Sequence, residues 1–193
     1  QAGDLLPPLS ETDSLIRDLA ERLSRNPLLA KLAATKGAMR AIVLAVVQIG
    51  DGRTPAKALA ALQPVGHLTL AEGAPARIDP ASYARWTGAV GALTSVNPAD
   101  AAQVYVNVKP LLDEAYAELG YPNGDFDQAV VKAIRTPAAT PDLEISPTAT
   151  QRSGYVEHED ATLRALLPVQ KQPLLIGPEH RRAGMRLLRE LAK

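Results

Sequence analysis

The chain has 193 residues, with 21 basic and 21 acidic side chains, no cysteine, one tryptophan and a hydrophobic fraction of 46%. This length is enough for one domain with a substantial core, and the lack of cysteine excludes disulfides, thiolate nucleophiles and zinc–cysteine sites. A net charge of zero argues against a general nucleic-acid binder, which carries a basic surplus.

Helical patterns dominate the chain from residue 10 onward. Capping side chains, prolines in first turns and apolar residues at helical spacing predict helices over residues 10–25, 27–35, 38–50, 55–62, 80–95, 98–119, 126–135 and 161–171, and a last helix from Gly177-Pro178-Glu179 to about 192. The segment 38–50 is apolar on most sides, so we expect it at the centre of the domain. Pro110 is expected to bend or divide the helix that contains it.

Two short segments favour β structure, and one favours a loop. Partial alternation predicts a short strand or hairpin near 67–78, and residues 152–157 are expected to form a short strand. Residues 136–150 hold three prolines and four threonines, which is typical of a loop and is where a boundary between two lobes would fall. The prediction is a mainly α, compact multi-helix domain over 10–193 with a small β appendage, preceded by a linker remnant over 1–9.

The chain carries few signs of reactive chemistry or of a membrane span. Gly-x-Ser-x-Gly, P-loop, Gly-x-Gly-x-x-Gly and His-Glu-x-x-His motifs are absent from the sequence, and no two of its histidines have ligand spacing. The longest apolar run, 41–47, is far shorter than the ~20 residues that cross a bilayer, so this fragment is not expected to span a membrane. We therefore expect no catalytic residue, no cofactor and no metal.

One aromatic cluster is a candidate binding site. Tyr83, Arg85 and Trp86 lie together, and Trp86 is suited to stack on a ligand while Arg85 holds an anion. The alternative is an aromatic hinge between the β appendage and the helices, with Arg85 packed over a ring. Tyr121 and Phe126, on either side of a turn, are interpreted as core anchors.

Charge is segregated in the second half of the chain. Residues 113–127 hold five acids and no base, whereas the basic groups of 181–193 face one acid, Glu190. Those basic groups are Arg181, Arg182, Arg186, Arg189 and Lys193. Either the two stretches are solvated faces that pair within the fold, or they form a partner-docking surface.

Four stretches together resemble a bacterial family known as domain of unknown function 3014. They are LPPLSETD (6–13), DPASYARW (79–86), YAELGYPNGDFD (116–127) and PVQKQPLLIGPEHRRAGMRLLREL (168–191), of which the third is the most specific. Trp86 stands where the family is expected to have tyrosine. The resemblance implies a bacterial envelope location, on the periplasmic side, behind a membrane anchor or lipid and a proline-rich linker. It implies no catalytic residues, because the family has no assigned activity.

These observations favour a non-enzymatic, soluble envelope domain that binds another envelope protein or the cell wall, with Arg181, Arg182 and Arg186 as candidate contacts. The alternative is a small-ligand binder or an enzyme with a cleft near Tyr83, Arg85 and Trp86. A structural or oligomerisation module is a third hypothesis. No nucleic-acid partner is expected, and the sequence leaves the oligomeric state open.

Overall fold

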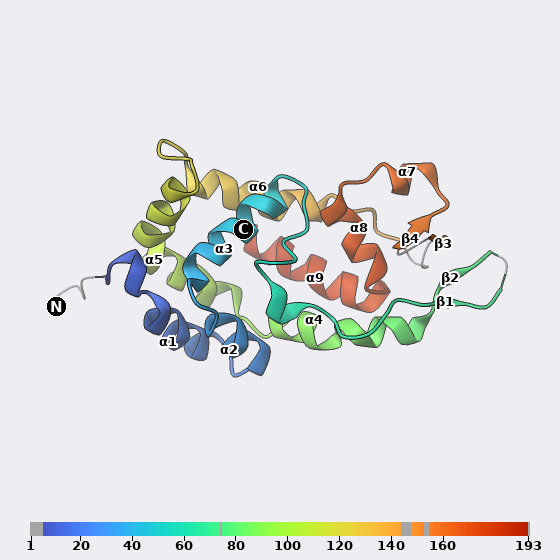
Figure 1. Cartoon of the computed structure of the whole chain (residues 1–193), viewed down its shortest axis with the longest axis horizontal. Helices are drawn as coiled ribbons and strands as arrows, with labels where there is room; N and C mark the ends of the chain where they lie inside the picture. Colours follow the sequence, from blue (N-terminus) through green and yellow to red (C-terminus); the bar gives the residue numbers. More distant parts are fainter. Residues whose placement is uncertain (1–5, 74, 144–147, 153–154, 193) are drawn as a thin grey trace.

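The computed structural model describes residues 6–73, 75–143, 148–152 and 155–192. Over these residues the chain forms nine α-helices, three 3₁₀ helices and two small antiparallel sheets of two strands each (Figure 1). The prediction of a mainly α domain with a small β appendage is therefore confirmed. The expectations for residues 1–5 of the linker remnant and 144–147 of the loop lie outside the described residues.

The elements follow one another with short connections. The α-helices are α1 (Asp13–Leu23), α2 (Pro27–Ala33), α3 (Ala38–Gly50), α4 (Thr87–Thr94), α5 (Pro98–Glu118), α6 (Phe126–Ala138), α7 (Ala161–Arg164), α8 (Pro168–Leu175) and α9 (Pro178–Leu191). The 3₁₀ helices are η1 (Leu9–Glu11), η2 (Ala60–Leu62) and η3 (Pro80–Trp86).

The strands form two hairpins at one end of the molecule, on the right in Figure 1. They are β1 (Leu70–Ala71), β2 (Arg77–Ile78), β3 (Ala149–Arg152) and β4 (Tyr155–His158). Leu70 pairs with Ile78 in the first hairpin, and Ala149 pairs with His158 in the second. A bridge between Arg77 and Thr148 joins the two hairpins into one appendage.

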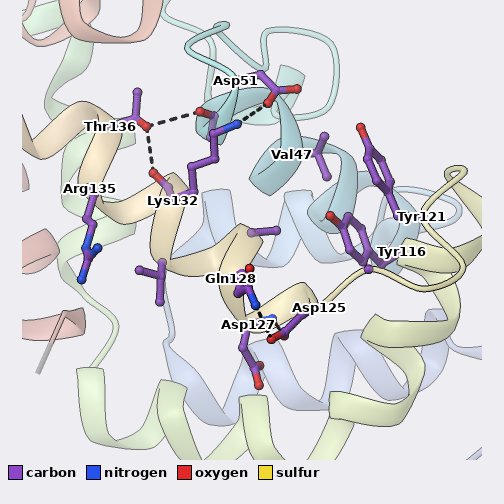
Figure 2. A pocket seen from close by; sticks show the side chains of 14 residues that line it. Val47, Asp51, Tyr116, Tyr121, Asp125, Asp127, Gln128, Lys132, Arg135 and Thr136 are labelled. Atoms are coloured by element: carbon purple, nitrogen blue, oxygen red, sulfur yellow. Dashed lines mark hydrogen bonds and ion pairs between the residues drawn. The ribbon is translucent and has the colours of Figure 1, made fainter.

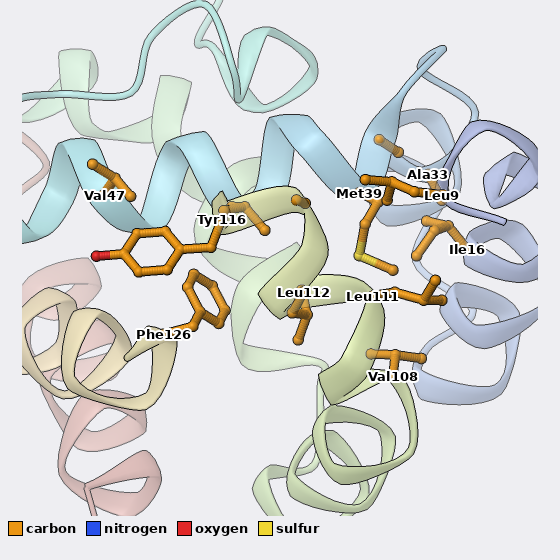
Figure 3. Close-up of a cluster of buried hydrophobic side chains, with 13 residues drawn as sticks. Leu9, Ile16, Ala33, Met39, Val47, Val108, Leu111, Leu112, Tyr116 and Phe126 are labelled. Atoms are coloured by element: carbon orange, nitrogen blue, oxygen red, sulfur yellow. The ribbon is translucent and has the colours of Figure 1, made fainter. Parts of the chain in front are cut away.

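The main core lies around α3, as its apolar sequence predicted. Helix α3 packs against α6, α5 and α1. Its buried Met39 and Val43 meet Ile16 of α1 and Leu112 of α5, and Phe126 closes the cluster at the start of α6 (Figure 3). A second cluster of Leu62, Ala89 and Ala92, with half-buried Trp86 against it, lies around α4.

Three predicted helices differ from the observed elements. Only Ala60–Leu62 of the segment 55–62 is helical, as a 3₁₀ turn, because so short a segment needs tertiary packing to stay helical and only Leu62 is buried. The segment 161–171 is divided into α7 and α8, because Pro168 keeps Leu167 in an extended conformation. The segment 80–95 begins as the 3₁₀ helix η3 and becomes α-helical at Thr87.

Helix α5 continues through Pro110. Proline lacks the N–H that would bond the carbonyl of Val106. Both residues are exposed, so water can satisfy that carbonyl. Of the two effects expected of Pro110, a bend or a division, the division does not occur.

Two corners of the fold repeat one Ser-x-Asn-Pro sequence. Asn26 Oδ1 accepts a hydrogen bond from Leu28 N at 3.0 Å, and Asn97 Oδ1 accepts one from Ala99 N at 2.8 Å, so each asparagine caps the helix that its proline begins. Ser24 Oγ and Ser95 Oγ, two residues before the asparagines, lie 2.6 Å apart. The corner before α2 and the corner before α5 are therefore side by side.

Within the described chain, no helix alone combines the length and apolar character that a membrane crossing requires. The pair α2 and α3 passes such a test only when the two are joined, and they meet at a bend of 104°.

Candidate functional site

A groove of about 760 Å³ lies between the C-terminal end of α3 and the exposed side of α6 (Figure 2). Tyr116 of α5 and the turn 121–125 contribute the rest of its surface. The turn belongs to YAELGYPNGDFD, the most specific of the family-like stretches. The lining residues are Val47, Gly50, Asp51, Tyr116, Tyr121, Gly124, Asp125, Asp127, Gln128, Ala129, Val131, Lys132, Arg135 and Thr136.

A stacked pair of tyrosines forms one end of the groove. The rings of Tyr116 and Tyr121 have their centroids 4.6 Å apart and are nearly parallel, at 8°. A Cβ atom at Gly124 would lie 2.7 Å from Cε1 of Tyr116, so the turn fits against this ring only with glycine at that position. Phe126, which is buried, packs against the other side of Tyr116 at 5.3 Å between centroids. One face of the Tyr121 ring therefore packs on Tyr116, while 42% of the residue stays exposed.

The two residues that we interpreted as core anchors thus have different roles. The prediction is confirmed for Phe126, which is 1% exposed, and is wrong for Tyr121. Burial raises the pKa of the Tyr116 hydroxyl, and the nearby Tyr121 and Asp51 raise it further. Tyr116 therefore stays protonated at neutral pH.

An ion pair joins α6 to the end of α3 across the middle of the groove. Lys132 Nζ donates to Asp51 Oδ1 at 2.8 Å, and Arg53 Nη2 donates to Asp51 Oδ2 at 3.3 Å. The hydrogen bond from Lys132 lowers the pKa of Asp51, and Asp51 in turn raises the pKa of Lys132. The hydroxyl of Thr136 lies 2.9 Å from the carbonyl oxygen of Lys132 and 3.3 Å from that of Gly50, and its single proton is donated to one of them.

The other two acids of the groove lie at the start of α6 and have hydrogen-bond partners within the domain. Asp125 caps this helix by accepting from Asp127 N at 2.9 Å, and it also accepts from Gln128 Nε2 at 3.1 Å. The carboxylate of Asp127 accepts a short hydrogen bond from the Tyr105 hydroxyl. Arg135, near the far end of α6, is exposed and makes no ion pair with any described residue. In Figure 2 the two tyrosines lie on the right, Asp125 lies low in the centre and Arg135 lies on the left.

The aromatic cluster of the sequence analysis is only partly gathered around one hollow. Tyr83 lies against Gly177, where a Cβ would be 2.6 Å from the Tyr83 ring, and it lines a hollow of about 360 Å³ together with Arg182 and His180. Arg85 and Trp86 are not among the lining residues of that hollow. Trp86 packs on the second core cluster, and its Nε1 is buried without a hydrogen-bond partner.

Sequence reasoning missed a hydrogen-bonded chain beside this hollow. His180 Nδ1 lies 2.9 Å from the carbonyl oxygen of Ile176, and His180 Nε2 lies 3.3 Å from Thr87 Oγ1. Because a carbonyl only accepts, Nδ1 carries a proton, and an unprotonated Nε2 can accept a hydrogen bond from the Thr87 hydroxyl. These hydrogen bonds link α4 to α9.

The arginines of α9 have two different environments. Arg181 is 2% exposed; its Nη2 lies 3.6 Å from Asp142 Oδ1, and its Nε and Nη2 have no hydrogen-bond partner. Burial lowers the pKa of Arg181. Arg182, Arg186 and Arg189 are exposed and make no ion pair with another residue in the described part of the chain. We call these three residues the arginine surface.

The arginine surface is flanked by two hollows. Arg182 lines the hollow beside Tyr83, and Arg186 lines a second one of about 480 Å³ next to Asn97 and Glu190. The three arginines occupy positions i, i+4 and i+7 of the helix, so they point within about 60° of one another and extend over about 10 Å.

The described residues include no group of three or more histidine, aspartate or glutamate side chains placed to hold a metal ion. His158 of β4 is buried, and neither of its ring nitrogens has a hydrogen-bond partner. Burial lowers the pKa of His158, and the charge of Lys171 lowers it further.

Comparison with protein families identifies the family of this chain. The family described as Protein of unknown function (DUF3014) matches residues 38–192, which is most of the chain, and the chain belongs to this family. No curated protein and no solved structure matches the chain significantly.

Proposed function

We propose that this domain is a non-enzymatic protein-binding module of the bacterial envelope, and that it docks an acidic partner on the arginine surface. The observation that carries the proposal is the exposure of Arg182, Arg186 and Arg189 on one face of α9 without an ion-pair partner among the described residues. Guanidinium groups bind carboxylates through two parallel hydrogen bonds, so a row of unpaired arginines favours an acidic protein surface. The envelope location rests on the family resemblance alone.

The proposal is tested with two variants that change the net charge equally. R182E/R186E/R189E reverses the arginine surface, and R17E/R22E/R25E reverses three exposed arginines at the other end of the chain. Each immobilised domain is exposed to envelope and cytoplasmic extracts. We expect an envelope protein that is retained by the wild type and the control variant and lost with the α9 variant.

The retained protein is then purified and titrated against the three domains. We expect the α9 variant to bind at least about tenfold more weakly, and binding by the wild type to weaken with salt, because each contact is a solvent-exposed charge pair. Equal binding by all three domains would contradict the proposal, as would a partner without a surplus of acidic residues.

A second candidate function, a small-ligand binder or an enzyme near Tyr83, is favoured by the Thr87–His180–Ile176 chain. A hydroxyl hydrogen-bonded to an oriented imidazole is the arrangement in which a general base activates a nucleophile. The test is acetylation by p-nitrophenyl acetate, followed by intact mass and peptide mapping. This function predicts an acetyl group on Thr87 that is lost in His180→Gln, whereas a purely structural link predicts no modification of Thr87.

A further inference from the structure

The two ends of the α3–α6 groove differ in the charge that they can accept. At one end the groove is lined by the exposed Tyr121, stacked on Tyr116, and by Asp125 at the start of α6. A cation over the face of a tyrosine is attracted by the ring, and a neighbouring carboxylate adds to this attraction. At the other end Arg135 has no ion pair within the described residues. This end is suited to a carboxylate.

The middle of the groove carries little net charge. Lys132 and Asp51 neutralise each other there, at 2.8 Å. Val47, Ala129 and Val131 add apolar surface beside them. A ligand that fits the groove therefore has uncharged groups at its centre and opposite charges at its ends.

The length of the groove follows from the helix that lines it. Positions 125 and 135 of α6 are about 15 Å apart along the helix axis. An extended chain advances about 3.3 Å per residue, so about five residues cover this distance. The volume of about 760 Å³ lies within the range of specific ligand sites.

We propose that this groove binds an extended peptide segment of about five residues, with lysine or arginine at the Tyr121 end and aspartate or glutamate at the Arg135 end. The Tyr121 ring is a rigid contact, because Gly124, Tyr116 and Phe126 hold it in place. Rigid aromatic contacts of this kind lose little entropy on binding. The site shares no residue with the arginine surface, so the two proposals stand or fall separately.

The first experiment uses three capped peptides of the same length, RAVAE, EAVAR and QAVAQ, in isothermal titration with the intact domain. The first two present the same charges in opposite chain directions, and the third is neutral. One of the two charged peptides is expected to bind about tenfold more tightly than QAVAQ, since each exposed charge pair contributes up to a factor of about five. Equal affinities for all three peptides, or no binding, would overturn the proposal.

The second experiment reverses the charge at one end of the groove. Arg135→Glu should weaken binding of the preferred charged peptide by about fivefold or more, and the variant should bind RAVAR more tightly than that peptide. Arg135 has no ion pair with a described residue, so the fold should tolerate the change, which a thermal melt checks. Arg25→Glu, at an exposed position outside the groove, is the matched control and should change neither affinity.

The third variant removes the aromatic contact. Tyr121→Ala should weaken binding of the charged peptide by about tenfold, and Tyr121→Phe should retain most of the affinity, because the ring face and not the hydroxyl makes the contact. Failure of RAVAR to rescue Arg135→Glu would overturn the proposal. So would loss of peptide binding in R182E/R186E/R189E, which would assign the peptide to the arginine surface instead.

Discussion

The acidic stretch 113–127 and the basic stretch at the end of the chain look alike in sequence and differ in the fold. Acids of the first stretch bond to other residues of the domain. Asp113 pairs with Lys109 at 2.5 Å, Glu118 pairs with Arg40 of α3 at 2.6 Å, and Asp125 caps α6. The basic stretch, by contrast, has only the long contact of Arg181 with Asp142 among the described residues.

The buried polar groups without a partner lie mostly outside the two stretches, and one of them, Arg181, is in the basic stretch. The buried side-chain nitrogens that have no hydrogen-bond partner belong to Arg85, Trp86, His158 and Arg181, in η3, β4 and α9. None of them comes from the acidic stretch. The comparison teaches that a run of like charge stays unpaired where the fold brings no opposite charge to it. The predictions below test this difference, beginning with the largest expected effect.

Removing the aromatic anchor of the acidic stretch should have the largest effect. Phe126→Ala deletes a ring that is 1% exposed and contacts Tyr105 and Tyr116, so the free energy of unfolding should fall by about 3–5 kcal/mol. Urea titration followed by far-UV circular dichroism measures the change. Phe126→Leu, the control, should lose about half as much or less. A loss below about 1 kcal/mol for the alanine variant would mean that the stretch is not held by its core contact.

The corresponding test, at the start of the helix that carries the basic stretch, concerns the contact between Gly177 and Tyr83. Gly177 has φ +90°, and a Cβ there would lie 2.6 Å from the Tyr83 ring. Gly177→Ala should therefore lower the free energy of unfolding by about 2–4 kcal/mol, through backbone strain and overlap with the ring. In a double-mutant cycle, Tyr83→Ala should relieve the overlap but not the strain. Strict additivity of the two variants would show that the ring is not in contact.

The buried histidine of β4, His158, predicts a pH dependence of stability. Burial holds the pKa of His158 below its value in the unfolded chain, about 6.5, so the unfolded state binds more protons. The free energy of unfolding should fall as the pH is lowered from 7 to 5, by less than about 1.4 kcal/mol per pH unit. His158→Phe should flatten this dependence. An equal slope in the variant and the wild type would assign the effect to other groups.

The smallest effect is expected at the exposed pairs of the acidic stretch. Lys109 and Asp113 are one turn apart on α5, and their coupling in a double-mutant cycle should be about 0.5 kcal/mol. It should decrease in high salt, because both side chains reach solvent. A coupling above about 2 kcal/mol would show that the acids stabilise the fold strongly and are not merely neutralised.

The sequence predicted the elements whose ends are set locally. Gly37 and the Gly50-Asp51-Gly52 turn bound α3, and Asn26-Pro27 and Asn97-Pro98 begin α2 and α5, so their positions follow from the chain itself. The hairpin near 67–78 followed from alternation. Of the short strand expected over 152–157, residue 152 ends β3 and 155–157 belong to β4, while 153–154 lie outside the described residues.

The groove was not predictable in the same way. It joins Asp51, Tyr116 and Lys132, which are far apart in the sequence, and no local pattern indicates that they meet. The turn before α6 was predicted, but nothing in the sequence indicates that Gly124 contacts the ring of Tyr116. The burial of Arg181 could not be predicted either. A run of arginines indicates a solvent-exposed face, and which side of the helix is buried depends on the elements that pack against it.

The paired Ser-x-Asn-Pro corners have a consequence for the order in which the domain folds. The Ser24–Ser95 contact closes a loop of 71 residues, so it can form only after both corners exist and α1 and α4 have been brought together. Ser24→Ala should accordingly speed unfolding and leave the refolding rate nearly unchanged in stopped-flow kinetics, as expected for a contact that is made after the rate-limiting step.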